Sequence, residues 1–233
     1  MTFTMPKLLS SLLACLSLAA TSALAAEPAV NPHPTLRAMS GAVPIDRLDP
    51  ASTALLVIDF QQEYFTGRLP IPDGQKALNK ARELIAFADK ARIPVYQIQH
   101  IAPAGSAVFA LDGEGVKFHP QMLPRAGDTV LQKTTVSVFG STELDRLLKA
   151  KGIKTVIIAG LMTHACVAGG ARDAAPLGYQ VVVASDASAT RSITRADGSS
   201  IDANSLHRAA LASVEDTFGD VMTTAQIVKL PLK

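Results

Sequence analysis

The chain has 233 residues, a formal net charge of +2 and no long run of like charge. This balance excludes the strongly basic surface by which nucleic acid is usually bound, so nucleic acid is not an expected partner. The part from residue 51 onward, about 180 residues, suits one domain with a full apolar core and is too short for two lobes.

The N-terminus predicts an exported protein. Lys7 is followed by an almost uncharged stretch from Leu8 to Leu24, and Ala25 supplies the cleavage site of a signal peptide over residues 1–25. No charged anchor follows the apolar run, so we expect a periplasmic or secreted protein without a stable membrane anchor. Lipidation at Cys15 is the alternative, although the apolar run continues well past that residue.

Residues 26–50 are rich in proline and predict an N-terminal arm, with the domain at 51–233. Removal of the signal peptide takes away one lysine and no acid, which lowers the net charge from +2 to +1 and leaves Cys166 as the only cysteine. A single thiol in an oxidising compartment cannot form an intramolecular disulfide. It is either a small buried apolar residue or a reactive group.

Short β-rich apolar runs alternate with helix-period segments from Thr53 to the C-terminus. This alternation predicts an α/β fold, with a doubly wound, mainly parallel sheet and helices on both faces. The expected strands are 53–59, 94–98, 129–133, 155–159, 179–184 and a short one near 221. The expected helices are 73–92, one that Ser141 caps and Gly152 ends, 166–177, 202–217 and one from 224. Residues 100–127 have no period and predict a loop that covers a pocket.

Three chemically capable residues fall at the carboxyl ends of expected strands: Asp59, Lys133 and Cys166. Ligands of doubly wound sheets bind at that edge. A helix N-terminus and the nearby Lys133 ammonium would favour the thiolate of Cys166. Asp59 could take the thiol proton and later return it to a leaving amine. Taken singly, the carboxylate could equally be a helix cap and the lysine a solvated strand end.

Four ordered motifs occur between Ala51 and about Leu230: LLVIDFQQEYF, K-x-x-x-S-x-F-x-x-T-x-L, GLMTHACV and VVVASDA. With them the chain resembles the isochorismatase-like cysteine hydrolases, which include nicotinamidases and carbamoylsarcosine amidohydrolase. The resemblance implies the three-layer αβα fold of that family, a small-molecule substrate and assembly into a homodimer or homotetramer. It also implies that Asp59, Lys133 and Cys166 form a catalytic triad.

The same resemblance implies a cis peptide bond at Leu161-Met162 and an oxyanion hole made by the backbone N–H groups of Met162 and Cys166. Nicotinamidases carry an Asp-x-His metal site after the second strand, where this chain reads Gln97 to His100 without an acid. We therefore expect no metal and no other cofactor.

Aromatic residues near the triad motifs predict a small apolar pocket lined by Tyr64, Phe65 and Phe139. Phe60 and Phe139 could instead belong to the core, and Tyr64 and Phe65, which follow the strand end, are the better candidates for the pocket wall. His164, two residues before the cysteine, could touch the substrate or the thiolate, and a surface position is the alternative. The adjacent Gly169-Gly170 has no functional account at this level.

The predicted activity is hydrolysis of the C–N bond of a small amide through a Cys166 thioester. Arg191 and Arg195, in the loop after the fifth strand, could bind a substrate carboxylate. Two other functions remain open: hydrolysis of an isochorismate-like ether, which does not need the cysteine, and non-catalytic binding of a small molecule in the periplasm. The motifs do not identify the substrate.

Overall fold

The computed structural model describes residues 1–4 and 33–233, so the predicted signal-peptide cleavage site and Cys15 lie outside the described residues. Pro34 to Lys233 form one compact unit. Leu48 is buried within it, and both Arg37 and the Ile45 N–H bond to Asp220. These contacts bring residues 34–50 into the unit, so the boundary expected at residue 51 falls inside it. No helix of the described part is long and apolar enough to cross a bilayer.

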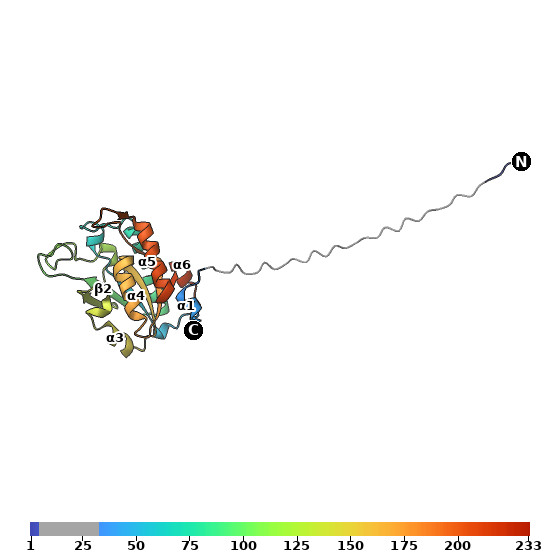
Figure 1. Cartoon of the computed structure of the whole chain (residues 1–233). Coiled ribbons are helices and arrows are strands. Elements are labelled where there is room, and N and C mark those ends of the chain that lie inside the picture. Colours follow the sequence, from blue (N-terminus) through green and yellow to red (C-terminus); the bar gives the residue numbers. More distant parts are fainter. Residues whose placement is uncertain (5–32) are drawn as a thin grey trace. The chain divides into compact units, whose positions relative to one another are not determined.

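The central sheet lies within the folded part of the chain (Figure 1). It has six parallel strands of the described residues, in the order β3-β2-β1-β4-β5-β8. Their bounds are β1 Thr53–Ile58, β2 Val95–His100, β3 Thr129–Lys133, β4 Thr155–Leu161, β5 Gln180–Ala189 and β8 Asp220–Met222. A separate two-stranded ribbon pairs β6 (Ile193–Thr194) with β7 (Ser200–Ile201). The parallel, doubly wound sheet predicted from the sequence is confirmed.

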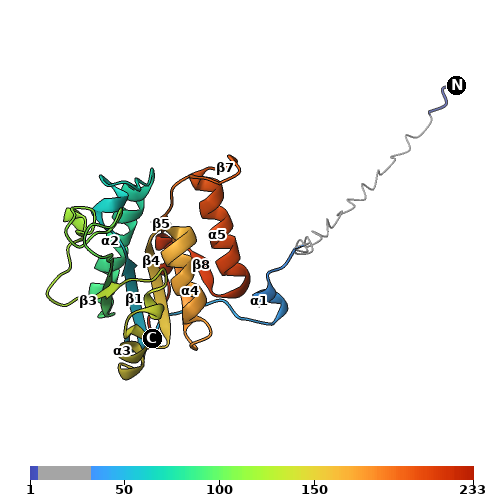
Figure 2. The ribbon, with the colours of Figure 1, turned by 60° about the vertical axis from the view of Figure 1, so that its left-hand side comes forward.

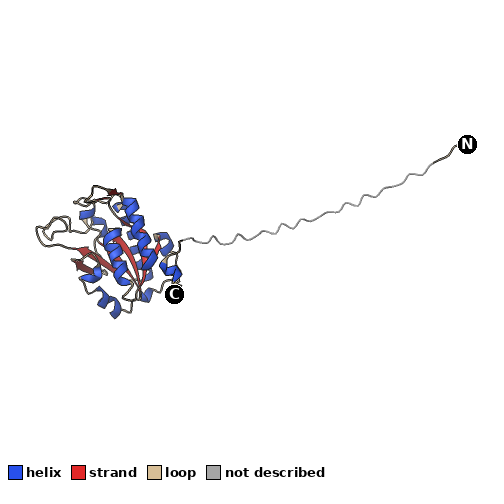
Figure 3. Cartoon of the chain, in the orientation of Figure 1, coloured by secondary structure: helices blue, strands red, loops and turns tan. Residues whose placement is uncertain are grey.

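Helices cover both faces of the sheet (Figures 2 and 3). Alternate residues of β1 point to opposite faces of the sheet. Leu55 and Val57 belong to the core beneath α2, and Leu56 and Ile58 belong to the core beneath α3 and α4. Both cores are apolar, which explains the unbroken burial of β1. The helices are α1 Leu36–Met39, α2 Gly74–Ala91, α3 Leu144–Ala150, α4 Ala168–Ala174, α5 Ala203–Thr217 and α6 Thr224–Ile227. Short 3-10 turns are Pro50–Ser52, Gln62–Tyr64, Pro120–Met122 and Val138–Gly140.

Helix α3 starts later than predicted. Ser141 was expected to cap it, but the helix begins at Leu144 with Glu143 in the cap position. The Ser141 hydroxyl oxygen instead accepts the N–H groups of Thr134 and Thr135. It therefore ties down the segment that follows β3, which is a tertiary contact that a capping pattern does not reveal.

The segment after β4 differs most from the prediction. A π-helical turn, Thr163–Val167, precedes α4, and the expected helix 166–177 is reduced to Ala168–Ala174. A Cβ atom on Gly169 would lie 3.3 Å from Val136 Cγ1, which is a tight contact, whereas one on Gly170 would lie 3.6 Å from Ile58 Cδ1, which is an ordinary one. Close packing therefore gives a structural reason for Gly169, and nothing in the structure explains Gly170.

Candidate active site

The triad residues come together at the carboxyl edge of the sheet. Asp59 follows β1, Cys166 lies in the turn after β4, and Lys133 ends β3. Strands β1 and β4 are neighbours, while the chain leaves β1 towards β2 on the other side. A doubly wound sheet opens a crevice where the winding direction changes in this way, and ligands bind there.

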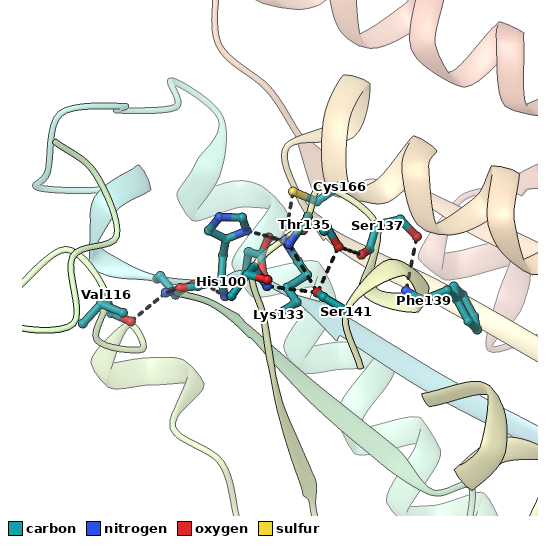
Figure 4. Close-up of polar contacts among 11 residues, drawn as sticks. His100, Val116, Lys133, Thr135, Ser137, Phe139, Ser141 and Cys166 are labelled. Carbon is teal, nitrogen blue, oxygen red and sulfur yellow. Dashed lines mark hydrogen bonds and ion pairs between the residues drawn. The ribbon is translucent and has the colours of Figure 1, made fainter. Parts of the chain in front are cut away.

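Lys133 connects the other two groups, and Figure 4 shows its contact with Cys166. Its Nζ atom lies 2.8 Å from Asp59 Oδ2 and 3.3 Å from Cys166 Sγ. The side chains of Asp59 and Lys133 are fully buried, and Cys166 is 5 % exposed. The Asp59 carboxylate and Cys166 Sγ lie within 4.8 Å of each other, and a hydrogen bond between the two side chains affects the pKa of both groups. The carboxylate is thus placed to accept the thiol proton.

The backbone around Asp59 is shaped for this role. Asp59 has a φ angle of +55°, a region that favours glycine, and its N–H donates to Ile98 O at 3.0 Å. The neighbouring Gln61 is fully buried; it donates to the carbonyls of His100 and Val116 and accepts the His100 N–H. Gln61 therefore fixes the end of β2 and the following loop beside the carboxylate. Gln61 lies within the LLVIDFQQEYF motif, and the motif alone predicts no role for it.

Burial controls the protonation of the triad. The pKa of the Cys166 thiol is raised to about 12, first by burial and then by the Asp59 charge, against the lowering effect of Lys133. Burial also raises the pKa of the Asp59 carboxyl, against the lowering effect of Lys133. The lysine thus acts in the predicted direction, while burial and the carboxylate charge act against it and favour the neutral thiol.

His100 is a further member of the cluster that the sequence analysis did not assign. Its Nδ1 atom lies 2.7 Å from Lys133 Nζ, as the strand register that pairs His100 with Lys133 requires. Burial and the lysine charge lower its pKa to about 4. The ring is therefore neutral near pH 7, and Nδ1 accepts a hydrogen bond from the ammonium group. The strand-end position of His100 was the only sequence signal for this contact.

The pKa of His100 predicts how stability depends on pH. The folded value of about 4 lies below the unfolded value of about 6.5, so the unfolded chain binds more protons between these pH values. Stability is therefore lost as the pH falls from about 6.5 towards 4. We expect His100→Asn, which retains an acceptor and does not titrate, to lose less stability than wild type between pH 7 and pH 5 in urea unfolding. Equal losses in the two proteins would contradict this assignment.

The position of the Lys133 ammonium group bears on the expectation that the site binds no metal. Asp59, His100 and Cys166 each offer a ligand atom, and these atoms lie within 4.8 Å of one another. The Lys133 ammonium lies within contact distance of all three and already supplies the positive charge between them. A metal ion would have to displace a buried ammonium group.

We therefore expect chelators to leave activity unchanged. The check is to measure turnover before and after exhaustive dialysis against EDTA, with metal analysis of the dialysed protein. Loss of activity that a stoichiometric metal ion restores would overturn the expectation.

The turn before Cys166 provides a candidate oxyanion site. The Leu161-Met162 peptide bond is cis, at the predicted position. No hydrogen-bond acceptor is found for the Met162 N–H within the described chain. Cys166 follows four residues later in the π-helical turn. The geometry leaves the Met162 N–H available for a ligand.

The four predicted pocket residues have different surroundings. Tyr64 is buried against Phe109, with ring centroids 5.3 Å apart, and burial, followed by the Asp59 charge, raises the pKa of its hydroxyl. His164 Nδ1 lies 2.6 Å from Thr190 Oγ1. These two residues stay candidates for the pocket wall.

The other two aromatic residues pack elsewhere. Phe65 stacks on His119 with ring centroids 4.3 Å apart. The expected pocket role of Phe139 is corrected, because its ring points away from the triad and lies 6.1 Å from that of Tyr179 in the core beneath α3 (Figure 4). The motif that contains Phe139 thus has a packing role at this position.

The two arginines considered as partners for a substrate carboxylate have different surroundings. Arg195 pairs with Asp197 on the surface at 3.1 Å. Arg191 acts electrostatically on Tyr64 and on His164, and its Nε atom is buried without a hydrogen-bond partner among the described residues. Arg191 is therefore the better candidate of the two for a substrate carboxylate.

One well-formed cavity lies away from the triad. It has a volume of about 610 Å³ and lies between α2 and the end of β5, where Asp73, Ser188 and His207 are among its lining residues. None of Asp59, Lys133 or Cys166 lines it. The triad itself is closed over, in part by Phe109, whose ring packs on His100 at 4.9 Å.

With this geometry established, comparison with known proteins identifies the family. Residues 53–226 match the family model described as the isochorismatase domain. The chain belongs to the isochorismatase family. It is accordingly a member of a family of α/β hydrolases, and the resemblance seen in its motifs is confirmed.

Two curated relatives carry informative names. Maleamate amidohydrolase of Pseudomonas putida is 32% identical over 73% of this chain and 82% of its own length. The secreted isochorismatase effector Isc1 of Verticillium dahliae is 30% identical over 83% of this chain and 98% of its own length. The solved structure of a cysteine hydrolase from Pseudomonas syringae pv. phaseolicola superposes with a TM-score of 0.76 at 25% identity, covering 85% of this chain and 97% of that one. The family thus includes amidohydrolases and cysteine hydrolases.

Proposed function

We propose that this isochorismatase-family hydrolase cleaves the C–N bond of a small amide through a thioester on Cys166. The observation that carries the proposal is the position of the buried Lys133 ammonium, within contact distance of both the Asp59 carboxylate and the Cys166 thiol. Non-catalytic binding does not explain three buried, interacting reactive groups.

In the first half of the reaction, Asp59 takes the thiol proton while Cys166 Sγ attacks the amide carbon. The negative charge moves from the carboxylate to the sulfur and then to the carbonyl oxygen, while Lys133 remains positive beside both partners. The N–H groups of Met162 and Cys166 receive the oxyanion of the tetrahedral intermediate. Collapse breaks the C–N bond, and Asp59 returns the proton to the leaving nitrogen.

In the second half, water attacks the thioester. Asp59 removes a proton from this water, and the second tetrahedral intermediate uses the same two N–H groups. Collapse releases a carboxylic acid, and Asp59 returns the proton to sulfur. The sum is amide plus water to acid plus amine, and no redox partner is needed.

The surroundings of Arg191 support an acid amide as the substrate, meaning an amide that also carries a carboxylate. A guanidinium with a buried, unpartnered N–H beside the site matches a carboxylate in charge and geometry. The amidohydrolase relative named above acts, by its name, on maleamate.

Substitution of the two arginines tests this substrate class. We expect Arg191→Gln to raise the KM for an acid amide by about 10- to 100-fold, the loss expected for a hydrogen bond to a charged group, and to leave the KM for the uncharged analogue nearly unchanged. Arg195→Gln is the matched control and should leave both constants within about twofold, because exposed ion pairs contribute little. Equal effects of the two substitutions would remove Arg191 from the site.

A substrate screen tests the reaction class. Mature protein is incubated with a panel of small amides, half of them carrying a carboxylate, and released ammonia is measured. We expect release from acid amides in preference to neutral ones. Failure of every amide, with hydrolysis of an isochorismate-like ether instead, would replace the proposed function with the ether-hydrolase alternative.

Export from the cell and assembly into a homodimer or homotetramer remain proposals. A secreted relative supports export, and the family resemblance supports assembly. Cell fractionation and light scattering at micromolar concentration are the respective tests.

A further inference from the structure

The turn that holds the nucleophile has two side-chain attachments to other elements. Thr163 Oγ1 lies 2.8 Å from Nδ1 of His207 on α5, and His164 Nδ1 lies 2.6 Å from Thr190 Oγ1 after β5. The turn has no side-chain cap of its own at its N-terminus. These two contacts are therefore polar side-chain anchors for a stretch of irregular backbone.

The Thr163 contact lies closest to the candidate oxyanion site. Thr163 is 1 % exposed and directly follows Met162, whose N–H has no acceptor in the described chain. His207 also forms a backbone hydrogen bond at Ser185. Since Ser185 is part of β5, the imidazole links the sheet to the turn.

We propose that His207 is a positioning residue for the oxyanion hole and acts through Thr163 to hold the Met162 N–H in place. The proposal rests on the proposed amide hydrolysis, which is the reaction that needs this hole. His207 touches neither the triad nor the reacting atoms. Oxyanion stabilisation depends on donors that are already aligned before charge develops, so a small shift of Met162 reduces the rate.

Matched substitutions separate this role from simple packing. His207→Asn retains a polar atom near the position of Nδ1. His207→Leu introduces a side chain of similar shape to asparagine that has no polar atom. Thr163→Val removes only the hydroxyl, and Thr163→Ser retains it. Asn204→Leu, at an exposed position on the same helix, is the control.

We expect His207→Leu and Thr163→Val each to lower kcat by about 10- to 100-fold with little change in KM, less than the 10²- to 10³-fold loss for removal of an oxyanion donor. The double variant should lose no more than either single one, since both break the same contact. His207→Asn and Thr163→Ser should retain most of the activity. Alkylation of Cys166 by iodoacetamide should be unchanged in all of them, because that reaction passes through no oxyanion.

Additive losses, equal losses in His207→Asn and His207→Leu, or parallel loss of alkylation would each overturn the proposal. A second readout does not depend on turnover: the backbone amide NMR resonance of Met162 should shift in His207→Leu and Thr163→Val and stay in place in His207→Asn and Asn204→Leu. An unmoved Met162 resonance in every variant contradicts the positioning role. Absence of amide hydrolysis by the wild-type protein contradicts the proposed function instead.

Discussion

Cys166→Ala is expected to lower amide turnover by at least about 10⁴-fold, because it removes the atom that forms the thioester. The substitution should leave the fold intact. Cys166 is buried in the core beneath α4, and replacement of a thiol by a hydrogen there costs about 1 kcal/mol. Thermal unfolding checks that the variant is folded, and ammonia release measures the loss.

Cys166→Ser is the control for shape. It retains the volume and the hydrogen-bonding ability of the side chain, yet the hydroxyl is much harder to ionise than a thiol. We expect a loss close to that of Cys166→Ala. Turnover near the wild-type rate in either variant would exclude the cysteine as the nucleophile.

Asp59→Asn is expected to slow amide turnover and to speed the alkylation of Cys166. Turnover should fall by about 10²- to 10⁴-fold, since the amide can neither take the thiol proton nor return it to the leaving nitrogen. Alkylation of Cys166 near pH 8 should become faster. The Asp59 charge raises the pKa of the thiol and Lys133 lowers it, so removal of the charge brings the pKa down from about 12.

The pH profile of iodoacetamide labelling, mapped to the Cys166 peptide, measures this pKa in both proteins. Loss of a buried partner for Lys133 costs about 3 to 5 kcal/mol, so the variant must first be shown to be folded. Slower labelling together with slower turnover would mean that Asp59 activates the thiol in some other way. Retained hydrolysis would exclude Asp59 as the proton carrier.

Regular elements were predicted well because local pattern determines them. The apolar run that forms β1 and the helical period of α2 each specify an element almost alone, and the structure places α2 at Gly74–Ala91, against a prediction of 73–92. The α5 helix begins at Ala203, where Asp202 supplies the cap. The parallel order of the strands then follows from right-handed crossovers.

Irregular features could not be predicted because contacts between distant residues determine them. Ser141 lies beside Thr134 only after the chain has folded back, and the π-helical turn depends on packing against β5 and α5. Strand β5 extends to Ala189, beyond the predicted end at 184, because its last residues pair with Gly160 and Leu161 of β4.

In the candidate site, too, local pattern predicts some features and contacts between distant residues determine the others. Asp59, Lys133 and Cys166 could be found from strand ends and motif spacing, because parallel strands place their carboxyl ends together. The burial that raises the pKa of the thiol could not, since it depends on tertiary packing. The contact between His100 and Lys133 requires the register of β2 on β3, which the sequence does not specify.

Rapid-quench mass spectrometry of Cys166 during turnover of an acid amide tests the central claim most directly. Wild-type protein is mixed with substrate, quenched in acid over a series of times and digested. The account predicts that the Cys166 peptide gains the mass of the acyl group, and that Cys166→Ala shows neither the adduct nor turnover. Continued turnover in Cys166→Ala, with no adduct on wild-type Cys166 at any quench time, would contradict it.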